Sequence, residues 1–204
     1  MRQEAVVDLK DTLYLEALQK MREDYANAPY SAEITFWLAN AYYEQGVLYD
    51  PLKSDDFKWV VKKAYDLCLD ALKNFPESEG AKSCQSLLEK ISRKELSLTT
   101  DYATFQGSPF PALLSYRNVE TVYLRIIRMD PQKDRDVREL GREDTPLVMY
   151  LKEPAVSQWS LKLPSDGDFQ SHSVEISLPV LPLGYYILML SPNSEFTFRT
   201  DPVA

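Results

Sequence analysis

The spacing of apolar residues predicts a helical first half. Tyr14, Leu18 and Met21 recur three and four positions apart, which places them on one face of a helix. Segments of the same periodicity follow, with Ser31 as a candidate N-cap and Gly46 as a candidate stop signal. These further helices are expected at about residues 31–45, 55–74 and 78–92.

From Glu95 onward the apolar residues recur at every second position. Trp159, Leu161 and Leu163 alternate with polar residues, so one face of the strand is apolar. The charged first half of the stretch between residues 130 and 154 breaks this alternation and is predicted to be a solvated loop, followed by a short helical turn from Thr145. Seven strands are expected, at 95–100, 110–117, 121–129, 157–163, 173–178, 184–191 and 195–200.

Together the two patterns predict an α+β chain of two domains, because helices come first and strands follow. A helical domain is expected at 1–93. An antiparallel seven-strand β-sandwich of immunoglobulin or fibronectin type is expected at 94–204. Within it, Pro182 and Gly184 interrupt the pattern directly before a strand. Gly184 is expected to adopt a turn conformation that other residues avoid, and Tyr185 or Tyr186 to return its hydroxyl to the backbone as a tyrosine corner.

Composition narrows the function classes. Of 204 residues, 45% are hydrophobic, which is enough for packed cores, and the net charge of −8 argues against a nucleic-acid partner. Apolar runs such as Tyr185 to Leu190 are too short to cross a bilayer. The start, MRQEAVVDLKD, lacks the apolar core of a signal peptide. The chain is therefore expected to be either cytoplasmic or cut from a longer protein after its targeting segment.

Small residues in the helical half resemble the tetratricopeptide pattern. The first helix of the pair contributes Leu38, Ala39, Tyr42 and Gly46, and the second contributes Ala64, Cys68, Ala71 and Pro76. Thr35 stands where the family has an early tryptophan, and the segment VLYDPLKSDDFKW lengthens the connection between the paired helices. The resemblance implies either a groove that binds a peptide or a structural spacer.

The reactive side chains predict no catalytic, cofactor-binding or metal site. Cys68 and Cys84 allow a disulfide or two small buried apolar side chains, and the burial habit of free cysteine favours the second. His172 lies between Ser171 and Ser173, but neither serine is on a nucleophile elbow, so an exposed loop histidine is predicted.

Two further groups are interpreted as ordinary structure. Three acidic pairs lack the alternating loop that wraps calcium and are predicted to be solvated surface: Glu23–Asp24, Asp55–Asp56 and Glu143–Asp144. Four aromatic residues at helical spacing are predicted to be core rather than a ligand platform: Phe36, Trp37, Tyr42 and Tyr43.

The strand half carries a more specific resemblance. KELSLTT at 94–100 and PFPALLSYRNVETVYLRIIRMD at 109–130 are followed by VSQWSLKLP, HSVEISLPVLPLGYYILML and EFTF. In this order they resemble the early macroglobulin domain, of MG2 type, of bacterial alpha-2-macroglobulin-like proteins of the Bacteroidetes type. The helical segment ahead is similar to the N-terminal region of that group, so the resemblance covers residues from about 35 to 200.

This resemblance implies a non-catalytic, cofactor-free segment of a large cell-envelope protein that traps or inhibits proteases, located in the periplasm or at the outer membrane. Its implied partners are neighbouring domains of the parent chain and, through that chain, proteases. The family's Cys-x-Glu-Gln thioester motif is absent, since LDA follows Cys68 and QSL follows Cys84. Two alternatives remain: a stand-alone tetratricopeptide-like adaptor for a peptide, or a surface- or carbohydrate-binding sandwich whose only tryptophan is Trp159.

Overall fold

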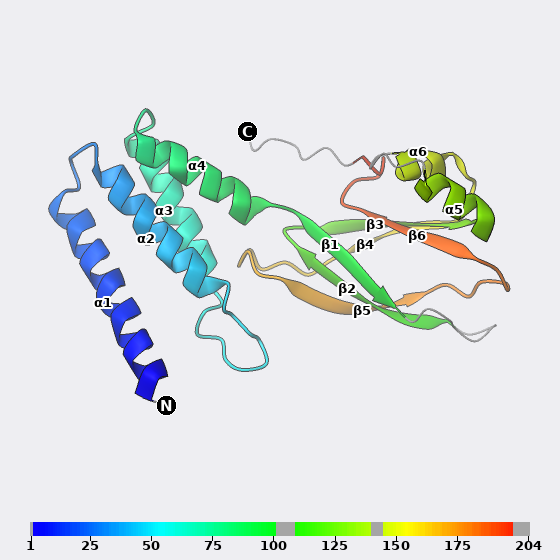
Figure 1. The fold of residues 1–204 in the computed structure, drawn as a ribbon, viewed down its shortest axis with the longest axis horizontal. Helices are drawn as coiled ribbons and strands as arrows, with labels where there is room; N and C mark the ends of the chain where they lie inside the picture. Colours follow the sequence, from blue (N-terminus) through cyan, green and yellow to red (C-terminus); the bar gives the residue numbers. More distant parts are fainter. Residues whose placement is uncertain (1, 101–108, 140–144, 198–204) are drawn as a thin grey trace. The chain divides into compact units, whose positions relative to one another are not determined.

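A computed structural model describes residues 2–100, 109–139 and 145–197 (Figure 1). Contacts divide the chain into two compact units. The helical unit consists of residues up to Arg93 together with Asp166–Gln170, and the strand unit contains the remaining described residues. The described residues form six α-helices and two antiparallel three-stranded sheets, which confirms the α+β prediction at this level.

The helical unit is built around its second helix. Its four helices are α1 (Arg2–Asp24), α2 (Ser31–Gly46), α3 (Val60–Asn74) and α4 (Glu79–Ser92). Helix α2 packs against each of the other three, and α3 also packs against α4 (Figure 1). Of the apolar face predicted for the first helix, only Leu18 is buried, whereas Tyr14 and Met21 are exposed, so the prediction was wrong for these two residues. The helices of this unit share one core. Its most buried members include Ala32, Leu38, Ala39, Val61, Ala64, Cys68, Cys84 and Ile91.

Two glycines allow these helices to approach closely. A Cβ on Gly80 would lie 2.3 Å from the backbone carbon of Ala32, and a Cβ on Gly46 would lie 2.6 Å from Cγ2 of Val61. Neither distance is compatible with a real side chain, so both crossings require glycine. Six residues of the predicted small-residue pattern are also buried: Leu38, Ala39, Tyr42, Ala64, Cys68 and Ala71. Membership of the tetratricopeptide family stays a prediction.

Two helix starts differ from the expectation. Helix α3 begins at Val60 rather than near residue 55, because polar side chains hold the preceding turns, as where Ser54 Oγ donates to Asp56 over 3.1 Å. The N-cap of α2 is Tyr30 without a side-chain cap, so the Ser31 prediction was wrong. Ser31 lies inside the helix, is buried, and accepts a 2.7 Å hydrogen bond from Thr35 Oγ1 on its carbonyl.

A segment distant in sequence completes the helical unit. Asp166 pairs with Lys58 at 2.7 Å, and the Phe169 ring stacks on Tyr65 with centroids 4.5 Å apart. Gln170 Nε2 donates a 3.0 Å hydrogen bond to the carbonyl of Gly46 at the end of α2. These residues lie within 94–204, the range predicted for the sandwich, because no local pattern identifies what a loop contacts.

The strand unit contains six described strands in two sheets. One sheet has the order β1 (Glu95–Thr100), β2 (Phe110–Arg117), β5 (His172–Leu178). The other has the order β4 (Ala155–Lys162), β3 (Thr121–Arg128), β6 (Tyr186–Ser191). All pairings are antiparallel, and the register of β3 with β4 shifts once, between Ile126 and Ile127.

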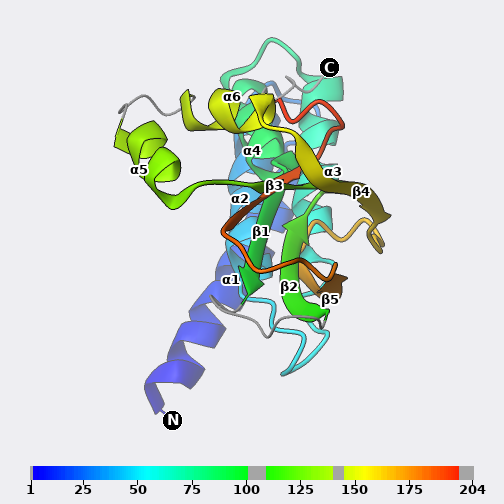
Figure 2. The ribbon, with the colours of Figure 1, turned by 90° about the vertical axis from the view of Figure 1, so that its right-hand side faces the viewer.

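Alternating side chains of both sheets form the main core of this unit. Ala112, Leu114 and Tyr116 of β2 share one cluster with Val122 and Leu124 of β3. The opposite face of the β4-β3-β6 sheet has its own apolar cluster, which α5 (Pro131–Glu139) and α6 (Thr145–Lys152) cover. Figure 2 shows both helices beside β3. One sheet of this unit is therefore covered on both faces.

The seventh predicted strand is not formed where the structure describes it. Glu195, Phe196 and Thr197 lie outside any strand, and residues 198–200 fall outside the described residues. The Asn193 side chain accepts from the Thr197 N–H at 3.1 Å and donates to the Thr197 carbonyl at 2.8 Å. Because this side chain satisfies both backbone groups, Thr197 does not pair with a strand.

The predicted solvated loop after residue 130 begins as a helix instead. Asp130 Oδ1 accepts the backbone N–H groups of Gln132 at 2.8 Å and Lys133 at 3.1 Å, and Pro131 occupies the first helical position. Aspartate followed by proline is a recognised start signal for a helix. The helical turn predicted from Thr145 is confirmed as α6.

The turn before β6 carries the expected hydroxyl contact. Tyr186 donates a 2.8 Å hydrogen bond to the carbonyl of Pro182. The expectation for Gly184 was wrong, because its φ is not in the left-handed region. Glycine at this position avoids close contacts instead, because a Cβ on Gly184 would lie 3.0 Å from the Tyr186 ring and 3.2 Å from Arg128 Nε.

Candidate functional site

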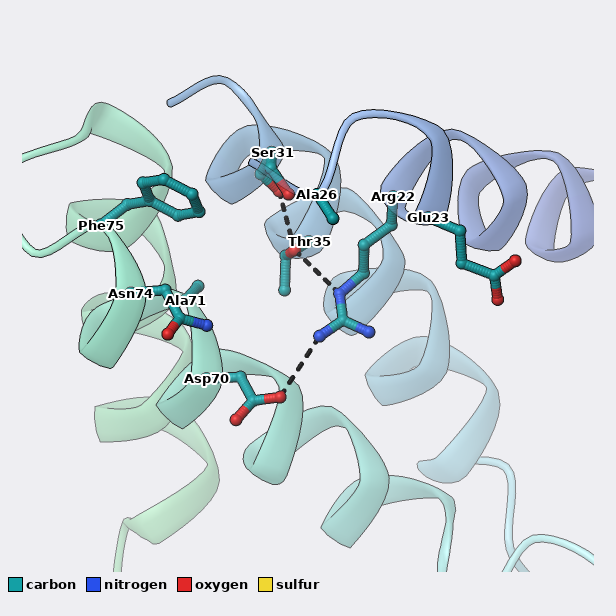
Figure 3. Close-up of a pocket in the computed structure, with 9 residues that line it drawn as sticks. All are labelled: Arg22, Glu23, Ala26, Ser31, Thr35, Asp70, Ala71, Asn74 and Phe75. Atoms are coloured by element: carbon teal, nitrogen blue, oxygen red, sulfur yellow. Dashed lines mark hydrogen bonds and ion pairs between the residues drawn. The ribbon is translucent and has the colours of Figure 1, made fainter. Parts of the chain in front are cut away.

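The helical unit has a small polar pocket where three helices meet. The pocket has a volume of about 200 Å³ and lies between the end of α1, the start of α2 and the end of α3 (Figure 3). Its lining combines a cation, two carboxylates, an amide, two hydroxyls and three apolar side chains. These are Arg22, Glu23, Ala26, Ser31, Thr35, Asp70, Ala71, Asn74 and Phe75.

Arg22 organises this pocket. Its Nε donates to Thr35 Oγ1 at 3.2 Å, and one terminal nitrogen contacts Asp70 Oδ2 at 3.2 Å (Figure 3). The Arg22 side chain is 32% exposed and that of Asp70 is 60% exposed. An ion pair so open to water contributes only about 0–1 kcal/mol. The pair therefore joins α1 to α3 loosely and leaves both charged groups accessible to a ligand.

The groups that line this pocket can hydrogen-bond a ligand. The Thr35 hydroxyl already donates to the Ser31 carbonyl and accepts from Arg22. A nucleophilic hydroxyl needs a base that removes its proton, and an arginine cannot act as one. The pocket instead presents hydrogen-bonding groups beside Phe75, which is the mixture that binds a polar chain with an apolar side group.

A second, more open groove continues along α3. It has a volume of about 400 Å³ and shares Asp70 with the first pocket. Trp59 marks its far end and is about half exposed. The remaining lining residues recur three and four positions apart, so they form one face of the helix: Lys62, Lys63, Asp66, Leu67 and Asp70.

The most strongly bonded acidic group lies in the strand unit and was not predicted. Asp134 of α5 is only 4% exposed. It accepts hydrogen bonds from Tyr150 of α6 and from Tyr185 at 2.6 Å, and Arg138 Nε lies 3.0 Å from its Oδ2. Burial alone would raise the pKa of Asp134, but the hydrogen bonds from Tyr150, Tyr185 and Arg138 outweigh it and lower the pKa.

This carboxylate acts as a structural anchor. Both of its oxygens are occupied by donors from three different segments, so it presents no lone pair to a substrate. The hydrogen bond to Asp134, with burial, raises the pKa of the Tyr185 hydroxyl, which keeps it a donor. One sequence signal was available: Arg138 follows Asp134 by four positions, the spacing of an ion pair on a helix.

The structure shows where the reactive residues singled out in the sequence lie and what they contact. Cys68 and Cys84 are free and buried, as predicted. His172 is the first residue of β5 and half-buried, with its ring 5.7 Å from that of Tyr116, rather than in an exposed loop. Ser173 Oγ is hydrogen-bonded at 2.8 Å across the sheet to Ser115 Oγ, which is a cross-strand pair.

The acidic pairs behave in different ways. Glu23 lines the polar pocket, and Asp55 accepts a 3.3 Å hydrogen bond from Tyr49 in an exposed turn. Glu143 and Asp144 lie outside the described residues. In the added segment of the helical unit, Asp166 is paired with Lys58. Calcium takes six to eight oxygen ligands, which is more than one acidic pair supplies.

The four aromatic residues of α2 divide into two groups. Tyr42 and Tyr43 are buried, as predicted, and each ring faces a lysine: Lys63 Nζ lies 3.9 Å from the Tyr42 centroid and Lys90 Nζ 4.4 Å from the Tyr43 centroid. Phe36 is partly buried against the core. Trp37 is 53% exposed, so its assignment to the core was wrong.

Comparisons with known proteins identify no relative of this chain: no family model, no curated protein and no solved structure matches it. Among the described residues, no helix is long and apolar enough to cross a membrane.

Proposed function

We propose that this chain is a non-catalytic scaffold and docking module from the N-terminal region of a macroglobulin-like cell-envelope protein. The observation that carries the proposal is that segments resembling a macroglobulin domain form strands in this structure. All but the last of the segments similar to a macroglobulin domain coincide with β1, β2, β3, β4, β5 and β6, in the order of the resemblance. The last segment, EFTF, is not in a strand at its described residues 195–197. The other segments build two antiparallel sheets around one core.

The polar interior of the strand unit supports the same role. Asp134 binds Tyr150, Tyr185 and Arg138, and Tyr116 donates its hydroxyl to the Pro164 carbonyl at 2.7 Å. Each of these groups joins segments of the fold rather than facing a cavity. An enzyme site instead needs polar groups that converge on space for a substrate.

The native polypeptide tests this proposal directly. An antibody raised against the chain is applied to fractionated source cells, before and after addition of a protease. We expect a band far larger than 23.5 kDa in the envelope fraction, cleaved to discrete pieces when protease is added. A soluble band near 23.5 kDa that protease degrades without discrete pieces would refute the assignment.

The pocket around Arg22 favours a second candidate function, a tetratricopeptide-like adaptor that binds a peptide. Peptides selected from a displayed library against the full chain should lose affinity for Arg22→Met and keep it for Lys82→Met. Lys82 is a suitable control because it also forms an exposed ion pair on a helix, with Glu79 at 2.7 Å. Equal loss in both variants, or in neither, would exclude this pocket as the peptide site.

A carbohydrate-binding sandwich is the third candidate and has the least support. Such a site requires an exposed aromatic face, and Trp159 packs against the core between the two sheets. We expect no retention of the chain on immobilised glycans. Retention that is lost in Trp159→Ala, with the fold preserved, would revive this candidate.

A further inference from the structure

The polar pocket around Arg22 contains a buried hydroxyl that the fold itself does not use. Ser31 lines the pocket and is only 4% exposed. Its backbone carbonyl accepts from Thr35, but its hydroxyl makes no hydrogen bond with any residue that the structure describes. Buried polar groups are nearly always hydrogen-bonded, because leaving one without a partner destabilises the fold. A ligand in the pocket would supply the missing partner.

The ion pair in the pocket also keeps an open donor and an open acceptor. Arg22 Nε is bonded to Thr35 and one terminal nitrogen to Asp70, each at 3.2 Å (Figure 3). Its other terminal nitrogen has no hydrogen bond to the described part of the chain, although a guanidinium carries five N–H donors. Only Oδ2 of Asp70 is bonded there, so Oδ1 can still accept. A ligand can therefore bond to both members of the pair without separating them.

The charges of the pocket favour a neutral ligand group. The lining contains two carboxylates, Glu23 and Asp70, and one cation, Arg22. A carboxylate ligand would have to displace Asp70 from Arg22, and an ammonium ligand would be repelled by the guanidinium. A primary carboxamide avoids both costs, because it is neutral, its oxygen accepts and its NH2 group donates.

The size and the apolar lining of the pocket suit one side chain. The volume is about 200 Å³. Sites for drug-sized molecules occupy about 300–1,000 Å³. Ala26, Ala71 and Phe75 give the pocket apolar surface, against which methylene groups can pack. A carboxamide at the end of a short methylene stem, as in glutamine, matches both the polar and the apolar parts of the lining.

We propose that the Arg22 pocket binds the carboxamide of a glutamine side chain in a peptide partner. The carboxamide oxygen accepts from Arg22, its NH2 group donates to Asp70, and the Ser31 hydroxyl supplies a further partner. The groove along α3 shares Asp70 with the pocket and offers a place for the neighbouring residues of the peptide. This inference rests on the peptide-adaptor candidate and names the side chain that its pocket recognises.

Four capped tripeptides test the assignment with the full chain. They are acetyl-Gly-X-Gly N-methylamides in which X is glutamine, glutamate, lysine or methionine, so the caps add no primary carboxamide. Each is titrated into the ¹⁵N-labelled chain while the backbone amide signals of Thr35 and Asn74 are followed. Glutamate has the shape of glutamine without its donors, and methionine has a similar length without its amide. We expect the glutamine peptide to bind at least about tenfold more tightly than each of the others.

A change of specificity separates a ligand contact from a structural effect. Asp70→Asn removes the charge that a carboxylate ligand must displace from Arg22, so this variant should bind the glutamate peptide more tightly than the glutamine peptide. Asp66→Asn is the matched control, because Asp66 lies one turn earlier on α3 and pairs with Lys62 at 2.7 Å outside the pocket. The control should keep the preference for glutamine.

Several results would overturn the inference. They are equal binding of the glutamine and methionine peptides, no signal change with any of the four, and an unchanged preference in Asp70→Asn. Free glutamine that binds as tightly as its tripeptide would overturn a peptide as the source of the carboxamide. The adaptor candidate fails by a different result, namely selected peptides whose affinity does not depend on Arg22. If Asp70→Asn does not fold, the four peptides still decide with the unchanged chain.

Discussion

Replacing Asp134 by asparagine removes one buried charge without changing the size of the side chain. The carboxylate accepts from Tyr150 and Tyr185 and pairs with Arg138. An asparagine keeps one acceptor oxygen but presents N–H donors where the second acceptor stood. At least one of the two tyrosine hydroxyls therefore loses its acceptor, and Arg138 loses its ion pair.

The size of the effect follows from these contacts. Hydrogen bonds to charged groups contribute about 1.5–3 kcal/mol each, and the lower cost of burying a neutral amide offsets part of the loss, so Asp134→Asn should destabilise the strand unit by about 2–4 kcal/mol. The matched control is Asp136→Asn, because Asp136 lies on the same helix, is exposed and accepts a 2.8 Å hydrogen bond from Gln132. This control should change stability by less than about 0.5 kcal/mol.

Urea denaturation followed by tryptophan fluorescence measures the difference. Trp159 is the tryptophan of the strand unit, whereas Trp37 and Trp59 belong to the helical unit. A background with both helical tryptophans changed to phenylalanine therefore reports the strand unit alone. With a slope of about 1–3 kcal/mol per molar urea, the expected loss of about 2–4 kcal/mol lowers the midpoint by about 0.7–4 M.

The same pair of proteins gives a pH test with a definite sign. The folded-state pKa of Asp134 is lowered, so its contribution to stability is present above the ordinary carboxyl pKa and disappears as the pH falls through the folded value. The free energy of unfolding of the parent should exceed that of Asp134→Asn by the same amount at pH 7 and at pH 6. The difference should shrink below about pH 4. An asparagine variant as stable as the parent at neutral pH would refute the reasoning, as would a difference that grows with acid.

Three further substitutions test the packing of each unit. Gly80→Ala gains about 1 kcal/mol of helix propensity but places a Cβ 2.3 Å from the Ala32 backbone. Thermal unfolding should therefore show a net loss of about 1–3 kcal/mol in the free energy of unfolding. A gain in stability would mean that the two helices can move apart without cost. Ser78→Ala removes the oxygen that caps α4 and should cost about 1 kcal/mol, while Ser78→Asp should not. Tyr116→Phe removes the hydroxyl bonded to Pro164 and should cost about 1 kcal/mol in urea; unchanged stability would show that this bond contributes nothing.

The spacing of apolar residues predicted much of the fold, because most strands and helices follow from the sequence of the segment that forms them. The strands at 95–100 and 110–117 coincide with β1 and β2 to the residue. The alternation there is a property of one short segment facing one core. Helix α5 carried an equally local signal, the Asp130 cap followed by Pro131, but its many charged residues led to the interpretation as a solvated loop.

The buried acidic site could not be predicted in the same way. Tyr185 follows Asp134 by 51 positions, and their contact exists only because β6 lies beside β3 in the sheet. Nothing in either local sequence identifies the other as its partner. The pocket around Arg22 is similar, since Asp70 follows Arg22 by 48 positions and meets it through the packing of α1 and α3 on α2.

The two polar clusters differ in how readily a ligand could replace a partner. Displacing Asp70 from Arg22 costs at most about 1 kcal/mol, since both side chains are solvated and the pair is weak. Displacing a tyrosine from Asp134 would remove one of the hydrogen bonds to a buried charged group, which costs about 1.5–3 kcal/mol. A binding partner that brings its own carboxylate or amide can therefore exchange with Asp70 at the Arg22 pocket but not with the donors around Asp134. Of these two polar clusters, the Arg22 pocket of the helical unit is therefore the one at which a ligand can replace a partner at low cost.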